Sequence, residues 1–174
     1  MEVEDDEIEL ESRREIYQTI DENPGIHFRE LLRRLDYAQG TLQYHLRWLE
    51  DENLIQESQD SDFTRYYTRG FETEDKRTMN ALRREYSRRI IAYLSREGEL
   101  TTSELAELVG KSNSTVSWHL SRLHDAGIVE KKREGRSVLY SLKDESKVKR
   151  LYTVHQKSFK DRLVDNILGL WDSY

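Results

Sequence analysis

Residues 101–142 read TTSELAELVGKSNSTVSWHLSRLHDAGIVEKKREGRSVLYSL, and they carry the clearest structural pattern in the chain. Two short amphipathic segments, residues 102–109 and 113–125, are separated by only three residues. Helix pairs joined by so short a turn form a recurrent unit in which the first helix positions the second. The stretch therefore predicts two short helices and a tight turn.

Both helices carry local start signals. Thr101 and Glu104 have the spacing of a capping box, and Ser112 is a natural N-cap for the second helix. In that second helix the apolar residues recur at helical spacing, which predicts a buried stripe of Val116, Leu120 and Leu123. The positions left on the outer face are Ser114, Ser117, Trp118, Ser121 and Arg122. Small hydroxyl side chains with one arginine and one aromatic ring suit the major groove of DNA, where acidic side chains would be repelled.

The end of the stretch predicts a β-hairpin. Gly127 ends the second helix, residues 128–133 alternate as a strand, and residues 136–142 return after a Glu134-Gly135 turn. The hairpin has more cations than acids, which indicates contact with phosphate groups. These cations are Lys131, Lys132, Arg133 and Arg136.

The segment SNSTVSWHLSRLHDAGIVEKKREGRSVLYSL, residues 112–142, resembles the ArsR-like and TrmB-like winged helix-turn-helix transcription regulators of bacteria and archaea. The shared features are a helix start of small residues, a His-Leu pair, a glycine turn and a basic hairpin. The resemblance implies a DNA-binding winged helix, although some winged helices bind only proteins. It extends more loosely to a second copy, as in tandem regulators of the archaeal type.

That second copy lies in the first half of the chain. Adding 74 to the residue numbers superposes Ile16 on Ile90, Thr41 on Thr115, His45 on His119 and Leu49 on Leu123. An ungapped match of this length indicates a repeated supersecondary unit. The first copy is expected to have helices at residues 28–35 and 39–51, and strands at 54–57 and 65–68.

The two copies differ in charge. In the first hairpin region only Arg65 opposes the acids Glu50, Asp51, Glu52, Glu57, Asp60 and Asp62, so phosphate should repel it. Its helices nevertheless carry groups that could contact a second stretch of DNA, which leaves DNA contact and a protein-binding or architectural role equally open. These groups are Arg29, Arg33, Arg34, Gln39, Gln43, Tyr44 and Arg47.

Composition bounds the class of protein. The chain has 174 residues, no cysteine and a formal net charge of −6. Residues 1–13 account for this charge, because Glu2, Glu4, Asp5, Asp6, Glu7, Glu9 and Glu11 face only Arg13. No apolar run is long enough to span a membrane, and the absence of cysteine favours the cytoplasm. The acidic start and the excess of arginine over lysine are typical of a salt-loving archaeon.

Three further helices are expected. One runs from Ile8 to Glu22, and residues 76–96 read as one long linker helix that would couple the two copies rigidly. Asp144 begins a last helix of about 27 residues whose apolar stripe predicts a dimer interface. The alternative is that this helix packs back on the linker. The dimerisation positions are Val148, Leu151, Phe159, Leu163, Ile167 and Leu170, with His155 on the same stripe.

Catalytic and metal-binding patterns are missing from the sequence. The five histidines, among them His45 and His119 beside the core stripes, do not cluster with carboxylates at ligand spacing, so they favour a structural role. No phosphate loop or nucleophile elbow is present, so neither an enzyme nor a cofactor is expected. Trp118 could contact DNA or cover the core beside Val138 or Tyr140, and the sequence favours neither.

The sequence thus predicts a mainly α protein with small β-hairpins (α+β), built from two tandem winged helix-turn-helix domains joined by a long helix, plus a C-terminal helix. The expected parts are an acidic arm (1–12), a first winged helix (13–71), a linker helix with the second winged helix (72–143) and a dimerisation helix (144–174). The predicted partner is double-stranded DNA, bound by a homodimer. The predicted DNA-binding residues are Ser112, Asn113, Ser114, Thr115, Ser117, Trp118, Arg122, Lys131, Lys132, Arg133 and Arg136.

Two rival functions remain open. Tandem winged helices also serve as protein-interaction modules in chromosome-organisation and basal transcription complexes, where acidic chains are common. The basic second hairpin argues against this rival, because a protein-only scaffold does not require those cations. The other is a ligand-responsive repressor with a pocket for an unidentified effector between the terminal helix and the linker helix.

Overall fold

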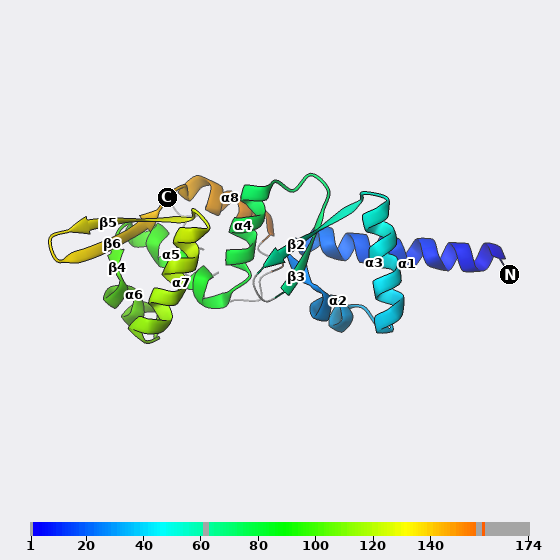
Figure 1. The fold of residues 1–174 in the computed structure, drawn as a ribbon, viewed down its shortest axis with the longest axis horizontal. Coiled ribbons are helices and arrows are strands. Elements are labelled where there is room, and N and C mark those ends of the chain that lie inside the picture. Colours follow the sequence, from blue (N-terminus) through cyan, green and yellow to red (C-terminus); the bar gives the residue numbers. More distant parts are fainter. Residues whose placement is uncertain (1, 61–62, 156–157, 159–174) are drawn as a thin grey trace. The chain divides into compact units, whose positions relative to one another are not determined.

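The computed structural model describes residues 2–60, 63–155 and 158 (Figure 1). The chain divides into two compact units, Met1–Lys76 and Arg77–Tyr174. The division falls inside helix α4 (Thr73–Leu82) rather than at residue 71, and the C-terminal helix belongs to the second unit. Among the described helices, none combines the length and the apolar character needed to cross a bilayer.

The first unit contains a winged helix-turn-helix fold. Its elements are α1 (Glu2–Glu22), β1 (Ile26–His27), α2 (Phe28–Arg34), α3 (Gln39–Asp51), β2 (Ile55–Asp60) and β3 (Phe63–Thr68). The three strands form an antiparallel sheet in the order β1-β3-β2. Apolar residues from α1, α2, α3 and the sheet form its core, and they include Ile16, Ile20, Leu31, Leu42, Leu46 and Ile55.

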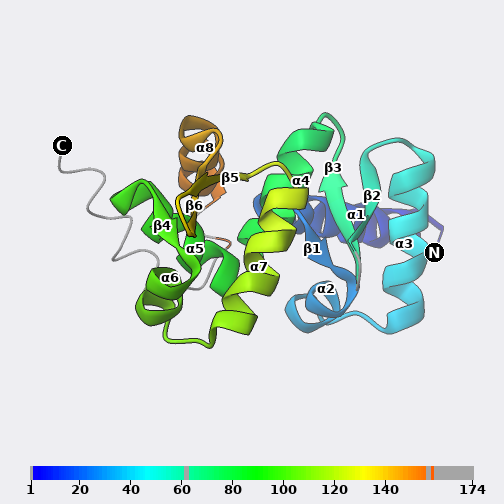
Figure 2. The same ribbon diagram turned by 60° about the vertical axis from the view of Figure 1, so that its left-hand side comes forward.

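The second unit repeats this order of elements. It contains α5 (Glu85–Glu97), β4 (Leu100–Thr101), α6 (Thr102–Val109), α7 (Asn113–Asp125), β5 (Val129–Glu134), β6 (Ser137–Leu142) and α8 (Glu145–His155). Its antiparallel sheet has the equivalent strand order, β4-β6-β5. Figure 2 shows the short connection between α6 and α7. The prediction of two copies of one fold is confirmed.

The predicted helix caps are present in the second unit. The N–H of Glu104 donates to Thr101 Oγ1 at 3.3 Å, and the N–H of Thr101 donates to Glu104 Oε2 at 2.7 Å. This reciprocal pair is the capping box. Gly110 ends α6 in the left-handed conformation at φ 70°, which a residue with a side chain adopts only with strain. The turn between the two helices is therefore encoded locally.

The prediction of a single linker helix is wrong. Residues 73–97 form two helices, α4 and α5, with a break at Arg83-Arg84. The backbone of Arg84 is extended, and the guanidinium of buried Arg88 donates a 2.7 Å hydrogen bond to the carbonyl of Leu82, the last residue of α4. This bond satisfies a carbonyl that the break leaves without a helical partner. Residues 76–96 therefore do not form one continuous helix.

The N-terminal arm also differs from the expectation. Helix α1 begins at Glu2, so the acidic lead-in is part of the helix that packs into the first unit rather than a separate segment. The strands of both hairpins extend further than expected, to Asp60 and Phe63 in the first unit and to Glu134 in the second.

The terminal helix begins as predicted, since the N–H of Lys147 donates to Asp144 Oδ1 at 2.9 Å. Val148 and Leu151 are each only 3% exposed within the single chain. Side chains buried to this extent within one chain have little surface left for a second copy, and their place in a dimer interface stays a prediction. The other dimerisation positions, Phe159, Leu163, Ile167 and Leu170, lie outside the described residues.

Candidate nucleic-acid interface

Helix α7 presents the outer face that the sequence predicts. It buries Val116, Leu120 and Leu123, together with His119. Because these residues fix the rotation of the helix, the polar positions between them face solvent. The exposed residues are Asn113, Ser114, Ser117, Trp118 and Ser121, with Thr115 and Arg122 half-buried.

The start of α7 is held by Ser112. Its hydroxyl accepts a hydrogen bond from the N–H of Thr115 at 3.3 Å and lies 3.0 Å from the hydroxyl of Ser114. Ser112 is therefore engaged in capping the helix. The first N–H groups of a helix and its dipole attract anions, so the start of α7 is suited to a phosphate group.

Trp118 lies at the centre of a group of cations. Its side chain is 49% exposed, so about half of it faces solvent and is available for contact. The guanidinium of Arg122 lies 4.9 Å from the indole ring, and that of Arg84 lies 5.9 Å from it. The ring also packs edge-on against His119 at 4.8 Å. Trp118 therefore presents an aromatic surface flanked by two guanidinium groups.

Two of the cations near this face were missed in the sequence. Arg84 lies in the break between α4 and α5, immediately before α5, and its guanidinium is near the Trp118 ring. Lys111, from the turn before α7, lies with its ammonium 4.6 Å from the ring of Tyr86 on α5. Neither contact has a signal in the sequence, since each joins residues from separate elements.

The β5–β6 hairpin extends beyond the helices of its own unit (Figure 1). It closes at Gly135-Arg136, between the paired residues Glu134 and Ser137. Lys131, Lys132, Arg133 and Arg136 are all exposed. All four predicted cations thus lie on the surface of the hairpin.

The two faces of this hairpin carry different charges. Successive side chains along a strand point to opposite faces. Lys131 and Arg133 therefore share one face, and Lys132 shares the other with Glu130 and Glu134. The first face has two cations and no acid on this strand, whereas the second has one cation between two acids.

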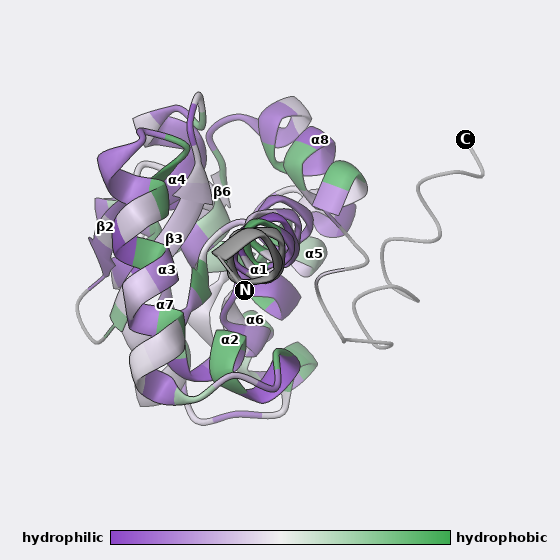
Figure 3. Cartoon of the chain, turned by 90° about the vertical axis from the view of Figure 1, so that its right-hand side faces the viewer, coloured by the Kyte–Doolittle hydropathy of each residue, from purple (hydrophilic) through white to green (hydrophobic). Residues whose placement is uncertain are grey.

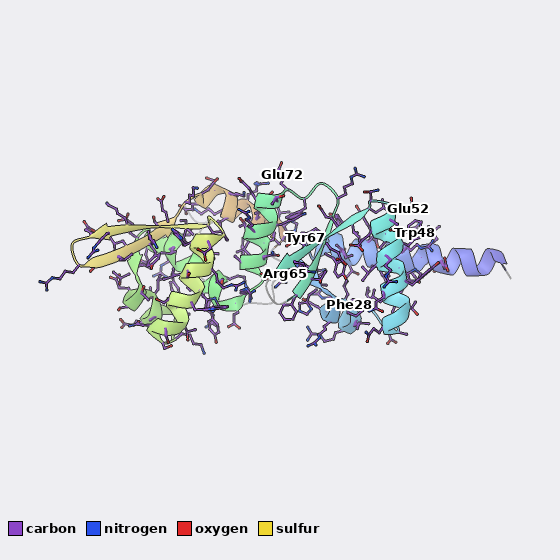
Figure 4. The ribbon with its side chains drawn as sticks, viewed as in Figure 1. Phe28, Trp48, Glu52, Arg65, Tyr67 and Glu72 are labelled. Atoms are coloured by element: carbon purple, nitrogen blue, oxygen red, sulfur yellow. The ribbon has the colours of Figure 1, made fainter. Side chains whose placement is uncertain are left out.

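The hairpin of the first unit cannot offer its arginine to DNA. Arg65, labelled in Figure 4, is 5% exposed and bonds to Asp60 at 3.0 Å and to the carbonyl of Gly25 at 2.8 Å. Burial, and next the carboxylate of Glu57, raises the pKa of Glu50 to about 7. The guanidinium of Arg65 is therefore occupied by contacts within the first unit and cannot bind a phosphate group of DNA. The acidic residues of this hairpin would then repel phosphate.

The helices of the first unit remain accessible. Gln39, Gln43, Tyr44 and Arg47 are exposed on α3, whose visible face in Figure 3 is mostly hydrophilic or near neutral. The other predicted groups of this surface, Arg29, Arg33 and Arg34, are also exposed, and Arg34 pairs with Glu30 at 2.8 Å. In the first unit, helix α3 is therefore accessible to DNA, whereas the hairpin is unsuited to contact with it.

The two repeated histidines are buried, as expected of structural residues. Ser87 Oγ lies 3.0 Å from Nδ1 of His119, whereas Nδ1 of His45 has no hydrogen-bond partner. Within the described residues, no group of three or more histidine, aspartate or glutamate side chains is arranged to hold a metal ion.

Each half of the chain matches a known protein family. Residues 10–79 match a family described as an N-terminal HTH domain, and residues 83–130 match the winged helix-turn-helix DNA-binding family. An HTH-type transcriptional regulator of Methanocaldococcus jannaschii, MJ1398, is 33% identical over 134 residues, which are 77% of this chain and 34% of that protein. A cadmium resistance transcriptional regulatory protein CadC homolog of Staphylococcus aureus is 46% identical over 56 residues, 32% of this chain and 46% of that protein.

The chain thus spans about a third to a half of the length of these two relatives. Among solved structures, the homodimeric winged helix-turn-helix DNA-binding domain Mb0332 of Mycobacterium bovis is 25% identical with a TM-score of 0.44, and the match covers 53% of this chain and 83% of that one. HlyU of Vibrio cholerae is also 25% identical, with a TM-score of 0.43 and coverage of 48% and 87%.

Both TM-scores are below 0.5, so these likenesses establish neither an assembly nor a ligand. The two family matches, one in each half, together with the repeated fold, decide the classification and do not favour the protein-interaction alternative. Each half of the chain therefore belongs to a helix-turn-helix family, and the second half to the winged helix-turn-helix DNA-binding family.

Proposed function

We propose that this chain binds double-stranded DNA through its second unit and thereby regulates transcription, inside the cytoplasm where such DNA lies. The observation that carries the proposal is the pairing, within one unit, of an exposed polar helix face on α7 with an exposed basic hairpin. A helix in the major groove reads base edges, while a basic hairpin contacts phosphates.

The roles divide between the two elements. Asn113, Ser114, Ser117, Trp118 and Arg122 contact base edges, and the start of α7 receives a phosphate group. Lys131, Lys132, Arg133 and Arg136 contact the sugar-phosphate backbone. Arg84 and Lys111 add positive charge beside α7. This role is supported by their positions near the rings of Trp118 and Tyr86, respectively.

The first unit has a smaller part in this proposal. Its α3 surface contacts DNA weakly, because the acidic hairpin beside it repels phosphate. Homodimerisation through the chain after α8 also remains a proposal. It is supported by the spacing of three and four residues between apolar positions such as Phe159 and Leu163.

The test is a titration of the full chain against random duplex DNA at several salt concentrations. Changing Lys131, Lys132 and Arg133 together to alanine should weaken binding and reduce its salt dependence, since phosphate contacts release counterions. A matched control replaces three exposed cations elsewhere, Arg14, Arg69 and Lys143, with alanine and so removes the same charge. Binding that is absent in the parent, or equal losses in the two variants, would contradict the proposal.

A further inference from the structure

Trp118 is the largest side chain on the outer face of α7. It is 49% exposed, and the exposed residues beside it on this face, Ser114, Ser117 and Ser121, are small. An indole ring is apolar apart from its single N–H group. A helix that enters a major groove through this face therefore brings an apolar ring against base edges, where hydrogen-bonding groups predominate.

The indole ring is supported from the side of α5. His119 packs against it edge-on, with ring centres 4.8 Å apart and planes at 89°. His119 is itself buried, and its Nδ1 lies 3.0 Å from Oγ of Ser87. Tyr86, which the first unit replaces with Ser12, lies 5.9 Å from the other ring of this pair, that of His119. Such support limits the motion of the indole before binding, so less conformational freedom is lost when a partner docks.

Two guanidinium groups lie near the same ring. Arg122 follows Trp118 by one turn of α7, and its guanidinium carbon is 4.9 Å from the ring centre. The corresponding distance from Arg84 is 5.9 Å. Guanidinium groups at such distances are attracted to the electron-rich face of an aromatic ring. The indole and Arg122 thus form one surface, in which an apolar ring adjoins a set of hydrogen-bond donors.

The repeat shows that this arrangement is particular to the second unit. Tyr44 takes the place of Trp118 in the first unit and is 52% exposed. The guanidinium of Arg13 lies 6.0 Å from the Tyr44 ring, but it is closer to Trp48, at 4.1 Å, and it is paired with Glu9. Both positions that hold the flanking arginines of the second unit are apolar in the first. The equivalent pairs are Leu10 and Arg84, Tyr44 and Trp118, and Trp48 and Arg122.

We propose that Trp118 contacts the 5-methyl group of a thymine in the major groove, while Arg122 hydrogen-bonds to a neighbouring guanine. The inference rests on the proposed DNA binding and names the base step that the second unit reads. The thymine methyl is the apolar group that base pairs display in the major groove, so it matches the indole. Guanine presents two acceptors, O6 and N7, which match the fork of an arginine.

The spacing of the two side chains favours adjacent bases. Successive bases are about 3.4 Å apart along a strand. The 4.9 Å between the indole centre and the Arg122 guanidinium is comparable with this rise. A ring and a guanidinium this close together can therefore meet a thymine and the guanine next to it.

The test begins with a duplex that the full chain selects from a random library, and this duplex should contain thymine beside guanine. Replacing that thymine with uracil removes the methyl group and keeps every hydrogen-bonding group of the base. Burial of one such group corresponds to about a fourfold change in affinity, so uracil should weaken binding by about fourfold. Cytosine and 5-methylcytosine at the same position should differ by a similar factor, in favour of the methylated base.

Two variants connect the methyl group to the indole. Trp118→Ala should bind the thymine and uracil duplexes alike. The matched control Tyr44→Ala removes the exposed ring at the equivalent position of the first unit and should keep the ratio between the two duplexes. Melting temperatures report whether Trp118→Ala impairs folding. If it does, Trp118→Gln, with a polar side chain on the same exposed helical position, decides the matter.

The outcomes separate this inference from DNA binding itself. If uracil weakens the parent and the Trp118 variants equally, or weakens the parent at no thymine, the inference is overturned while DNA binding stands. If Trp118→Ala loses the same affinity for every sequence, the ring packs on the sugar-phosphate backbone, and the inference is again overturned. If the full chain selects no sequence at all, the proposed function is contradicted and the inference fails with it.

Discussion

The unequal faces of the β5–β6 hairpin allow the proposed phosphate contacts to be tested in detail. The double variant Lys131→Ala, Arg133→Ala removes both cations of one face, whereas Lys132→Ala removes the single cation that lies between Glu130 and Glu134. Each phosphate contact contributes about 0.9 to the slope of log affinity against log salt concentration. The double variant should therefore lose about 1.8 of this slope. Lys132→Ala should lose much less than half of that, because the two acids repel phosphate.

These slopes translate into affinities that are easy to separate. Between about 50 and 200 mM salt, a slope difference of about 1.8 means that the parent loses about 12-fold more affinity than the double variant. Fluorescence anisotropy with a labelled random duplex measures this directly at four or five salt concentrations. All three residues are exposed, so the melting temperatures of the variants should match that of the parent. The reasoning is refuted if Lys132→Ala flattens the salt dependence as much as the double variant does.

Three further outcomes are expected. Arg122→Ala should weaken specific DNA binding by about 5- to 150-fold, the range for loss of a bidentate base contact. In the same binding assay, Arg47→Ala in the first unit should change the affinity by less than about threefold. Equal losses in the two variants would mean that both copies have the same role. Phe159→Glu with Leu163→Glu should convert a dimer to a monomer in light scattering, because like charges would face each other across a symmetric interface. A parent that is already monomeric would exclude this segment from any interface. The folded-state pKa of Glu50, about 7, is raised above its ordinary 4.5, so its protonated form contributes stability that is fully present below pH 4.5 and is lost as the pH rises through 7. Thermal melts at pH 5 and pH 8 should therefore differ less in Glu50→Gln than in the parent, and an unchanged difference would contradict this assignment.

Much of the second unit follows from local sequence. Helices α6 and α7 have the bounds that the pattern predicts, because Thr101, Gly110 and Ser112 satisfy or terminate the helix ends through bonds to neighbouring residues. Such caps act over three or four residues, so they are visible without the fold. The repeat at an offset of 74 then extends the same interpretation to the first unit.

The linker helix was mispredicted for a physical reason. Apolar residues keep their helical spacing from Met79 to Leu94, so the periodicity continues across the break. The break is stabilised instead by the hydrogen bond from Arg88 to the carbonyl of Leu82. A side chain that satisfies a backbone group six residues away has no characteristic pattern, so this break is not readable from periodicity.

The two histidines show the same limit. His45 and His119 have identical places in the repeat, and the sequence treats both as structural residues. Their surroundings differ because Ser12 and Tyr86, which lie far from them in the chain, fill the adjacent space differently. Side-chain packing between elements therefore decides which histidine lacks a partner.

The repeated fold, the caps and bounds of the α6–α7 pair, and the opposite charges of the two hairpins can all be predicted from the sequence. Each depends on residue type and on neighbours within about one turn of helix or one strand pair. Three features depend on packing between elements instead: Trp118 is exposed with Arg84 and Arg122 near its ring, Val148 and Leu151 are buried, and a cavity lies beside His45. Each of these depends on how far side chains from separate elements fill a shared space, which no spacing along the chain records.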